Sequence, residues 1–523
     1  MKTKNSSDIW RGQISRRALI GASTTVAVFG FPTFDARAQM EKPTPKRGGI
    51  LKVSAYLNPT RLDPVTGNGG QDQVFLWAMF DTLIDFEPQT MKPRPGLANW
   101  SYPDSKTMVL ELNPGITFHD GTPCDAEAVR WNLDRFMNGA RSSAKPDLAS
   151  VASIEVGGPL KVVLHLKNPD TALPVILSER CGMMSSPKAV KEAGDDYDRR
   201  PCGTGPFKFV SWADADRIIV TRNENYWKKD GPLLDGITFR IITDYAAGAR
   251  SVVAGENDFM YLVPPRLFKN LSADKNLTVI KAPSMRTMNL FFNYGRGPLQ
   301  DVRVRQAINY AIDRKGFARV TTDGTGAASG SLIVPQHWAA DAASMDRYPL
   351  DLEKAKRLLA EAGLEKGFEL SMVVLPDAEY RKRAEIVTDN LKKIGITVNM
   401  MPVQQANATF LADKKGDMYL VAWPGKPDMT QTYNLVFSKS SFYNPAGITP
   451  VENIEQLVDA TRMSEDVGER KAAFAKLINA EREAALFAPI CSEQLVYAMR
   501  TKVKGFEPNL LGKPKFDGVY LDT

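Results

Sequence analysis

Residues 384–400 read AEIVTDNLKKIGITVNM, and this stretch decides the fold class. Apolar residues recur at helical spacing from Ala384 to Ile394. Gly395 then ends the helix as a C-cap, and residues 396–400 follow as a short apolar strand. Helices of this length between short apolar strands indicate α/β crossover units.

The same alternation extends outward from this stretch. Two further amphipathic helices are predicted over residues 304–312 and 352–362, and a strand over 368–375. Nearer the N-terminus, the pattern predicts a strand from residue 50 and a helix over 125–137. A chain of 523 residues is too long for one hydrophobic core, so we expect an α/β protein of two or more domains.

The N-terminus reads as a secretory signal. Arg16 and Arg17 precede a moderately apolar run over residues 18–31, and Ala36-Arg37-Ala38 follows as an A-x-A cleavage pattern. The run is shorter than the ~20 residues that a membrane-spanning helix needs. We therefore expect residues 1–38 to be a twin-arginine signal peptide that is removed on maturation.

The positive charge of the chain is concentrated in this signal. Residues 1–38 hold six of the 67 Lys and Arg residues and two of the 60 Asp and Glu residues, so without them the formal net charge falls from +7 to +3. Such a charge gives no support to nucleic-acid binding. No later stretch approaches 18 uninterrupted apolar residues, so we expect a soluble periplasmic protein.

The four cysteines form no C-x-x-C pair, which argues against zinc or thioredoxin-type chemistry. Outside the cytosol a disulfide is permitted. Cys181 and Cys202 enclose the shortest loop and are the candidate pair.

The sequence lacks the patterns of the common enzyme classes. His119-Asp120 could support acid–base chemistry, but no G-x-S-x-G elbow accompanies it, and Asp120-Gly121 is typical of a tight turn. The three histidines show no metal-ligand spacing. Residues 323–326 resemble a phosphate loop but lack its Lys-Ser/Thr, so a flexible surface connection is expected there. We expect no enzymatic activity and no cofactor.

Several aromatic residues stand beside polar residues where strands give way to loops. They occur near Tyr56, Trp338, Trp423 and Tyr443. Aromatic walls with a few polar anchors are how small-molecule clefts are usually lined. This arrangement favours binding over catalysis.

Blocks along the whole mature chain resemble the peptide/nickel class (family 5) of bacterial ABC-transporter solute-binding proteins. The strongest block is GITFHDGTPCDAEAVRWNLDRFM (115–137). The other blocks are RGGILKV (47–53), MFDTLIDF (79–86), GTGPFKFVSW (203–212), RNENYW (222–227), RQAINYAIDRK (305–315), AKRLLAEAG (355–363) and DNLKKIGITV (389–398).

This resemblance implies a two-lobed periplasmic-binding-protein (flytrap) fold that closes on a solute and delivers it to an inner-membrane permease. Lobe I would comprise residues 39–283 and 495–523, with an extra subdomain at about 80–200, and lobe II residues 284–494. The hinge strands would be residues 286–293 and 490–499. In this family the HDGTP block is a structural turn.

The resemblance also places the loop that begins at Trp423 in the solute cleft. In peptide-binding members, the corresponding W-x-G-D loop carries an aspartate that pairs with the α-ammonium group of the peptide. Here Lys426 follows Trp423-Pro424-Gly425, and Asp428 lies two positions later. A buried ammonium group would repel a peptide N-terminus but would bind a carboxylate or phosphate.

We therefore expect one of two solute classes: an oligopeptide-like solute, or an anionic or zwitterionic compound derived from an amino acid. If Lys426 faces the cleft, the anionic or zwitterionic compound is favoured. If Asp428 faces it instead, peptides are again favoured. The predicted lining is Trp423, Lys426, Asp428, Tyr56, Asn58, Arg286 and Asn289.

The resemblance implies three partners for this chain: a small solute, the inner-membrane ABC permease and the twin-arginine export machinery. We expect a monomer. Two alternatives are a secreted hydrolase and a chaperone or sensor that uses the same fold. Nickel and haem are carried within the family, but the sparse histidines offer little for direct metal ligation.

Overall fold

The computed structural model describes residues 45–522, apart from residues 68, 69, 71, 341–345, 440, 442, 449 and 450. The described fold belongs to the compact unit that begins at Pro45. The predicted signal peptide lies outside the described residues.

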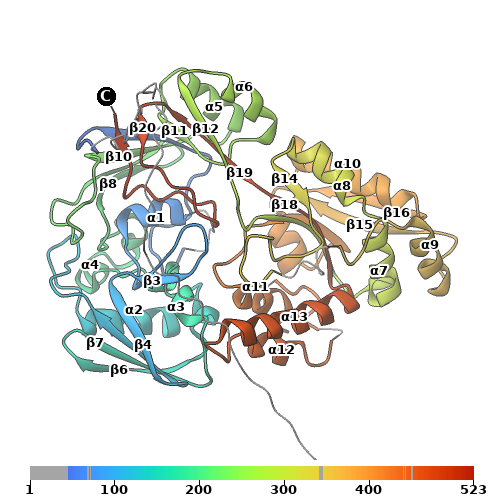
Figure 1. The fold of residues 1–523 in the computed structure, drawn as a ribbon, viewed down its shortest axis with the longest axis horizontal. Helices are drawn as coiled ribbons and strands as arrows, with labels where there is room; N and C mark the ends of the chain where they lie inside the picture. Colours follow the sequence, from blue (N-terminus) through green and yellow to red (C-terminus); the bar gives the residue numbers. More distant parts are fainter. Residues whose placement is uncertain are drawn as a thin grey trace, which may run out of the picture. The chain divides into compact units, whose positions relative to one another are not determined.

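Two large mixed sheets form the framework (Figure 1). The seven-stranded sheet has the order β12 (Leu277–Ala282), β19 (Leu495–Arg500), β11 (Phe259–Met260), β1 (Ile50–Ala55), β10 (Gly236–Ile241), β9 (Arg217–Arg222) and β8 (Phe207–Ala213). The six-stranded sheet has the order β14 (Gly326–Ala328), β18 (Phe487–Glu493), β13 (Thr287–Phe292), β17 (Met418–Trp423), β15 (Phe368–Val374) and β16 (Ile396–Pro402).

A smaller sheet is built from consecutive segments of the N-terminal part. Its order is β4 (Ala98–Asp104), β5 (Thr107–Leu112), β7 (Lys161–Leu166) and β6 (Val151–Gly158). It has a hydrophobic core of its own, to which α2 contributes Val129, Leu133 and Phe136. Two short antiparallel pairs complete the strands: β2 (Ile84–Phe86) with β3 (Pro93–Pro95), and β20 (Val503–Lys504) with β21 (Tyr520–Leu521).

The helices lie between these strands along the chain. Those of the first part are α1 (Gln73–Met79), α2 (Ala126–Asn138), α3 (Leu173–Ile176), α4 (Pro187–Ala193), α5 (Tyr245–Val253) and α6 (Phe268–Ser272). Those that follow β13 are α7 (Val302–Ala311), α8 (Arg314–Thr322), α9 (Leu352–Glu361), α10 (Ala378–Lys392), α11 (Met429–Phe437), α12 (Ile454–Ala460) and α13 (Val467–Ala484). The 3-10 turns are η1 (Lys145–Leu148), η2 (Arg180–Gly182), η3 (Gly194–Arg199), η4 (Pro265–Leu267) and η5 (Gly297–Gln300), and η7 (Ala408–Ala412) is a π-helix.

The α/β crossover predicted from residues 384–400 is confirmed. Strand β15 pairs in parallel with β16, and α10 connects them. The helix begins earlier than its apolar pattern, because the Asp377 side chain accepts hydrogen bonds from the backbone N–H groups of Glu379 and Tyr380. The predicted turn at His119-Asp120 is also confirmed, since Gly121 N donates to Phe118 O.

Residues 323–326 are a surface connection only in part, which corrects that prediction: Asp323 and Gly324 are exposed, but the next two residues are not. Thr325 is fully buried, and Gly326 opens strand β14 against β18. The reason is tertiary: pairing of residues 326–328 with β18 draws this glycine-rich segment into the six-stranded sheet.

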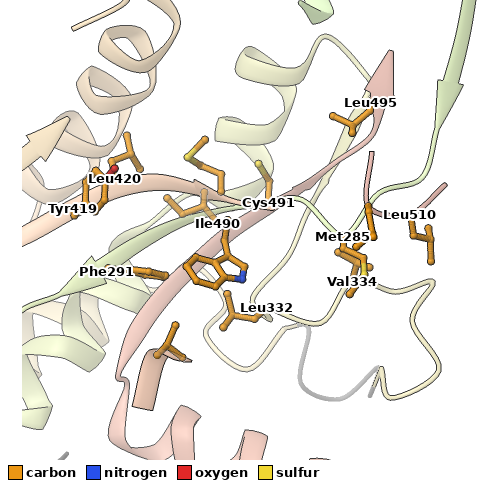
Figure 2. Packing of buried hydrophobic residues seen from close by; sticks show 14 of the residues in the cluster. Met285, Phe291, Leu332, Val334, Tyr419, Leu420, Ile490, Cys491, Leu495 and Leu510 are labelled. Atoms are coloured by element: carbon orange, nitrogen blue, oxygen red, sulfur yellow. The ribbon is translucent and has the colours of Figure 1, made fainter. Parts of the chain in front are cut away.

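The chain passes between the two large sheets at two adjacent places. Residues 283–286 connect β12 to β13, and Gln494 alone separates β18 from β19. The two crossings are joined, because Glu493 N donates to Arg286 O. Figure 2 shows buried side chains around them, including Met285, Leu495 and Leu510, and Met285 N donates to Leu510 O at 2.7 Å. These crossings form a narrow, well-packed junction between the sheets.

Candidate functional site

The loop that begins at Trp423 lies against the first crossing. Trp423 ends β17 and stands opposite Thr287 of β13. Gly425 has a φ of +75°, and a Cβ atom there would lie 2.5 Å from the Met285 Cβ. Only glycine satisfies both the left-handed conformation and this close approach. The loop is therefore fixed against the junction of the two sheets.

Trp423 forms part of an aromatic wall. Its ring centroid lies 5.9 Å from that of Phe291 and 5.3 Å from that of Tyr443, which meets it edge to face. Its buried Nε1 has no hydrogen-bond partner among the described residues. It is a buried donor that the described residues leave unpaired.

Lys426 reaches across to the part of the chain that carries the four-stranded sheet. Its Nζ lies 3.5 Å from Glu179 Oε2. Burial alone would lower the pKa of Lys426, but Glu179, followed by Asp147, raises it above its usual value. Lys426 is therefore charged and already has a counter-ion.

Glu179 is shared by several groups. Gln73 Nε2 donates to its Oε1 at 3.2 Å, and Lys513 Nζ lies 3.5 Å from the same oxygen. Burial would raise the pKa of Glu179, but Lys426 and Lys513 together lower it to about 2. This carboxylate is ionised at any physiological pH.

Asp428 has a structural role in the next helix. It is the N-cap of α11, where its side chain accepts from Thr430 N, and its Oδ2 lies 2.7 Å from Arg470. Only 2% of the residue is exposed. Both interactions hold the aspartate at the start of α11.

Arg286 lies at the first crossing and forms an ion pair with the second. Its Nε donates to Glu493 Oε2 at 2.8 Å. Arg383 of α10 lies 2.8 Å from the other oxygen of Glu493. Burial would raise the pKa of Glu493, but Arg383 and Arg286 lower it. The two crossings and α10 thus meet at one carboxylate.

Tyr56 follows β1 and stacks on Tyr245 at 5.3 Å, with Tyr261 edge-on at 5.7 Å. Burial is the largest cause of its strongly raised pKa, while Arg286 acts in the opposite sense. Tyr56 therefore stays neutral, near Arg286.

The two predicted asparagines are used elsewhere in the fold. Asn58 accepts from Trp212 Nε1 at 3.1 Å and donates to Asp214. Asn289 is fully buried in β13, where it donates to Thr287. The structure brings Tyr56, Arg286, Trp423 and Lys426 to the junction of the sheets, whereas the contacts of these asparagines are structural.

Arg286 and Lys426 share an unusual environment. For both, burial is the first influence on the pKa, yet 25% and 29% of the respective side chains remain exposed. A packed core would leave no such exposure, and an open surface would not desolvate the charge. Both cations are therefore largely enclosed by protein and still reach solvent.

Three more contacts join segments attached to different sheets. Gln431 of α11 donates to Asp147 of η1 at 3.2 Å. Thr171 N donates to Arg462 O at 2.9 Å. Arg266 and Glu379 form an exposed ion pair at 2.9 Å. The segments attached to the two large sheets therefore touch each other at several places.

Sequence reasoning missed Glu179, Arg383, Glu493 and Lys513. Glu493 could have been recognised as a candidate site residue, since it is an acidic residue at the end of a mostly apolar strand. The others stand in ordinary amphipathic or loop contexts, and no local pattern distinguishes them.

Cys181 and Cys202 are free thiols in the structure, so the candidate disulfide between them is not formed. Cys181 is buried in η2, within the core beneath the four-stranded sheet, and Cys202 only packs against the edge of that core. Closeness in sequence thus gave a poor guide to pairing. Burial raises the pKa of both thiols, which makes them unreactive.

Within the described residues, no group of three or more His, Cys, Asp and Glu side chains is placed to hold a metal ion. His337 is buried and His119 is half-buried, and the desolvation of each ring lowers its pKa to about 4. His119 Nε2 lies 3.0 Å from Gly205 O, as expected for a structural turn. Among the described helices, none is both long and apolar enough to cross a membrane.

Comparison with known proteins identifies the architecture. Residues 92–444 match the family described as bacterial extracellular solute-binding proteins, family 5 Middle. The glutathione-binding protein GsiB of Salmonella paratyphi A is 30% identical over 382 residues, which cover 71% of this chain and 74% of the relative.

Two solved structures share the fold at lower identity. The binding protein AgaA from A. tumefaciens R10, in complex with agropinic acid, has a TM-score of 0.82 at 24% identity and covers 91% of this chain and 99% of its own. DppA from Helicobacter pylori, in complex with the peptide STSA, has a TM-score of 0.83 at 23% identity, with the same coverage. The predicted two-lobed α/β fold is thereby confirmed. The chain belongs to family 5 of the bacterial extracellular solute-binding proteins.

Proposed function

We propose that this chain captures a small solute by closure of two lobes and delivers it to an inner-membrane ABC permease. Lobe I comprises residues 39–283 and 495–523, with the extra subdomain at about 80–200, and lobe II comprises residues 284–494. The junction at residues 283–286 and Gln494 acts as the hinge. Tyr56, Arg286, Trp423 and Lys426 line the cleft.

The observation that carries this proposal is the ion pair between Lys426 and Glu179. It joins the loop after β17 to the subdomain, and the hydrogen bond from Gln431 to Asp147 lies on the same side. In the proposed mechanism, contacts of this kind form when the lobes close. A solute that touches both lobes favours that state by its differential affinity, and about 5.5 kcal/mol moves the balance from 1:99 to 99:1.

The proposed solute is an anionic or zwitterionic compound derived from an amino acid, or a short peptide. The names of the relatives support this class, since GsiB is described as glutathione-binding and AgaA was solved with agropinic acid. Glutathione is the first candidate to test. We place the protein in the periplasm as a monomer without enzymatic activity, after export through a twin-arginine signal at residues 1–38.

Isothermal titration calorimetry with a solute panel tests the proposal. The panel contains glutathione, di- and tripeptides, and carboxylate-bearing compounds that are not peptides. Small-angle scattering with and without the best solute measures closure. We expect stoichiometric binding of at least one carboxylate-bearing member and a smaller radius of gyration. Release of chemically altered solute, or no binding by any member, would overturn the proposal.

A further inference from the structure

The positive charge at the hinge exceeds the negative charge that the structure pairs with it. Arg286 and Arg383 each form an ion pair with Glu493, and among the described residues these are the ion pairs of both arginines. Two guanidinium groups thus share one carboxylate. A buried surplus charge is costly unless an anion offsets it.

The hydrogen bonds of this cluster are also incomplete. Arg383 is 7% exposed, and its buried Nε has no acceptor among the described residues. Arg286 keeps a quarter of its side chain exposed. An unpartnered buried donor beside an accessible cation is a place where a ligand oxyanion would gain charge-assisted hydrogen bonds.

The neighbouring groups do not supply the missing anion. Tyr56, Tyr245 and Tyr380 lie close enough to Arg286 to interact with its charge, and burial raises the pKa of Tyr56 and Tyr245, which keeps them neutral. Asp377 also acts on Tyr245, but its side chain caps α10. The tyrosines instead offer hydroxyl groups that can donate to an oxyanion.

The Lys426 end of the cleft differs in its charge balance. Glu179 and Asp147 both act on Lys426, and Asp72 acts on Arg180 beside them. Lys426 therefore has acids on the protein itself. A second anion from a solute is less favourable there than at the hinge.

We infer that Arg383 and Arg286 form the subsite that anchors a carboxylate group of the solute, next to Glu493 at the hinge. This inference rests on the proposed solute-binding function and deepens it. It assigns to Arg383 a role in specificity that Lys426 was expected to have.

The test compares each acid of the panel with its amide, beginning with glutathione and glutathione amidated at its glycine carboxylate. The wild type should bind at least one acid of the panel about tenfold more tightly than the corresponding amide. Arg383→Gln should reduce that ratio to near one. Arg266→Gln is the matched control, because it removes an exposed charge from the same region without touching Glu493, and its ratio should stay unchanged.

A second variant should change the ratio of acid to amide affinity in the opposite direction. Glu493→Gln removes the carboxylate that competes with the solute, so affinity for the acid should rise relative to the amide. If the role of this cluster were purely structural, each variant would reduce the affinity for the acid and for the amide by the same factor.

Equal loss of acid and amide binding in Arg383→Gln, or an unchanged ratio, would overturn the subsite while leaving solute binding intact. Failure of the wild type to bind any acid of the panel would instead overturn the proposed function and the subsite with it.

Discussion

Replacement of Glu179 by glutamine should weaken solute binding by destabilising the closed state. Glu179 is the carboxylate between Lys426, which we assign to lobe II, and Lys513, which we assign to lobe I. The change keeps the shape of the side chain and its hydrogen bond with Gln73, but removes the charge. It leaves the ammonium group of Lys426 without that counter-ion.

The pKa of Glu179 gives the size of the effect. It falls from 4.5 to about 2, and at about 1.36 kcal/mol per pKa unit this corresponds to about 3 kcal/mol in favour of the charged form. Burial opposes this shift, while Lys426 and then Lys513 cause it. If about half comes from Lys426, closure loses about 1–2 kcal/mol, or about tenfold in affinity.

Calorimetry with the tightest solute of the panel measures this loss, and scattering measures closure. Lys426→Met should cost a similar factor, and the double variant should cost less than the product of the two, because both remove one interaction. An unchanged dissociation constant in Glu179→Gln would show that the ion pair with Lys426 does not stabilise the closed state. The same conclusion would follow if Glu179→Gln reduced affinity by its full factor in the Lys426→Met background, since Glu179 would then act independently of Lys426.

Three further predictions concern stability and chemistry. Burial raises the pKa of Asp81 to about 6, so its carboxylate makes the wild type less stable as pH rises from about 4 to about 6. In urea unfolding, the stability of Asp81→Asn relative to wild type should therefore be about 3 kcal/mol higher at pH 8 than at pH 3.5. Asp428→Ala removes a helix cap and strands Arg470, so the unfolding free energy should fall by about 3 kcal/mol or more, and a smaller loss in thermal melts would argue against a structural role. Native protein should react slowly with a thiol reagent and unfolded mature protein should expose four thiols, whereas two missing thiols would indicate a disulfide.

The sequence predicted those parts of the fold that depend on local patterns. The helical spacing before Gly395 and the apolar strand after it were enough to identify the α10–β16 crossover. The prediction placed the start of the helix late, since the cap at Asp377 precedes a polar first turn. Thr325 was misplaced because pairing of residues 326–328 with β18 overrides the local preference of a glycine-rich segment.

The candidate site was predicted only where a single loop carries it. Trp423 and Lys426 follow one strand and could be recognised together. The counter-ions could not, because Glu493 lies 207 positions from Arg286 and Lys513 lies 334 positions from Glu179. Such pairs form when distant segments fold onto one junction, so local sequence patterns cannot predict them.

Native mass spectrometry of the protein purified from its host tests the central claim most directly, namely that the chain closes on a small carboxylate-bearing solute. We expect a one-to-one complex with a compound that carries at least one carboxylate group and is released on unfolding. A bound neutral sugar, or a metal complex without a free carboxylate group, would contradict this expectation.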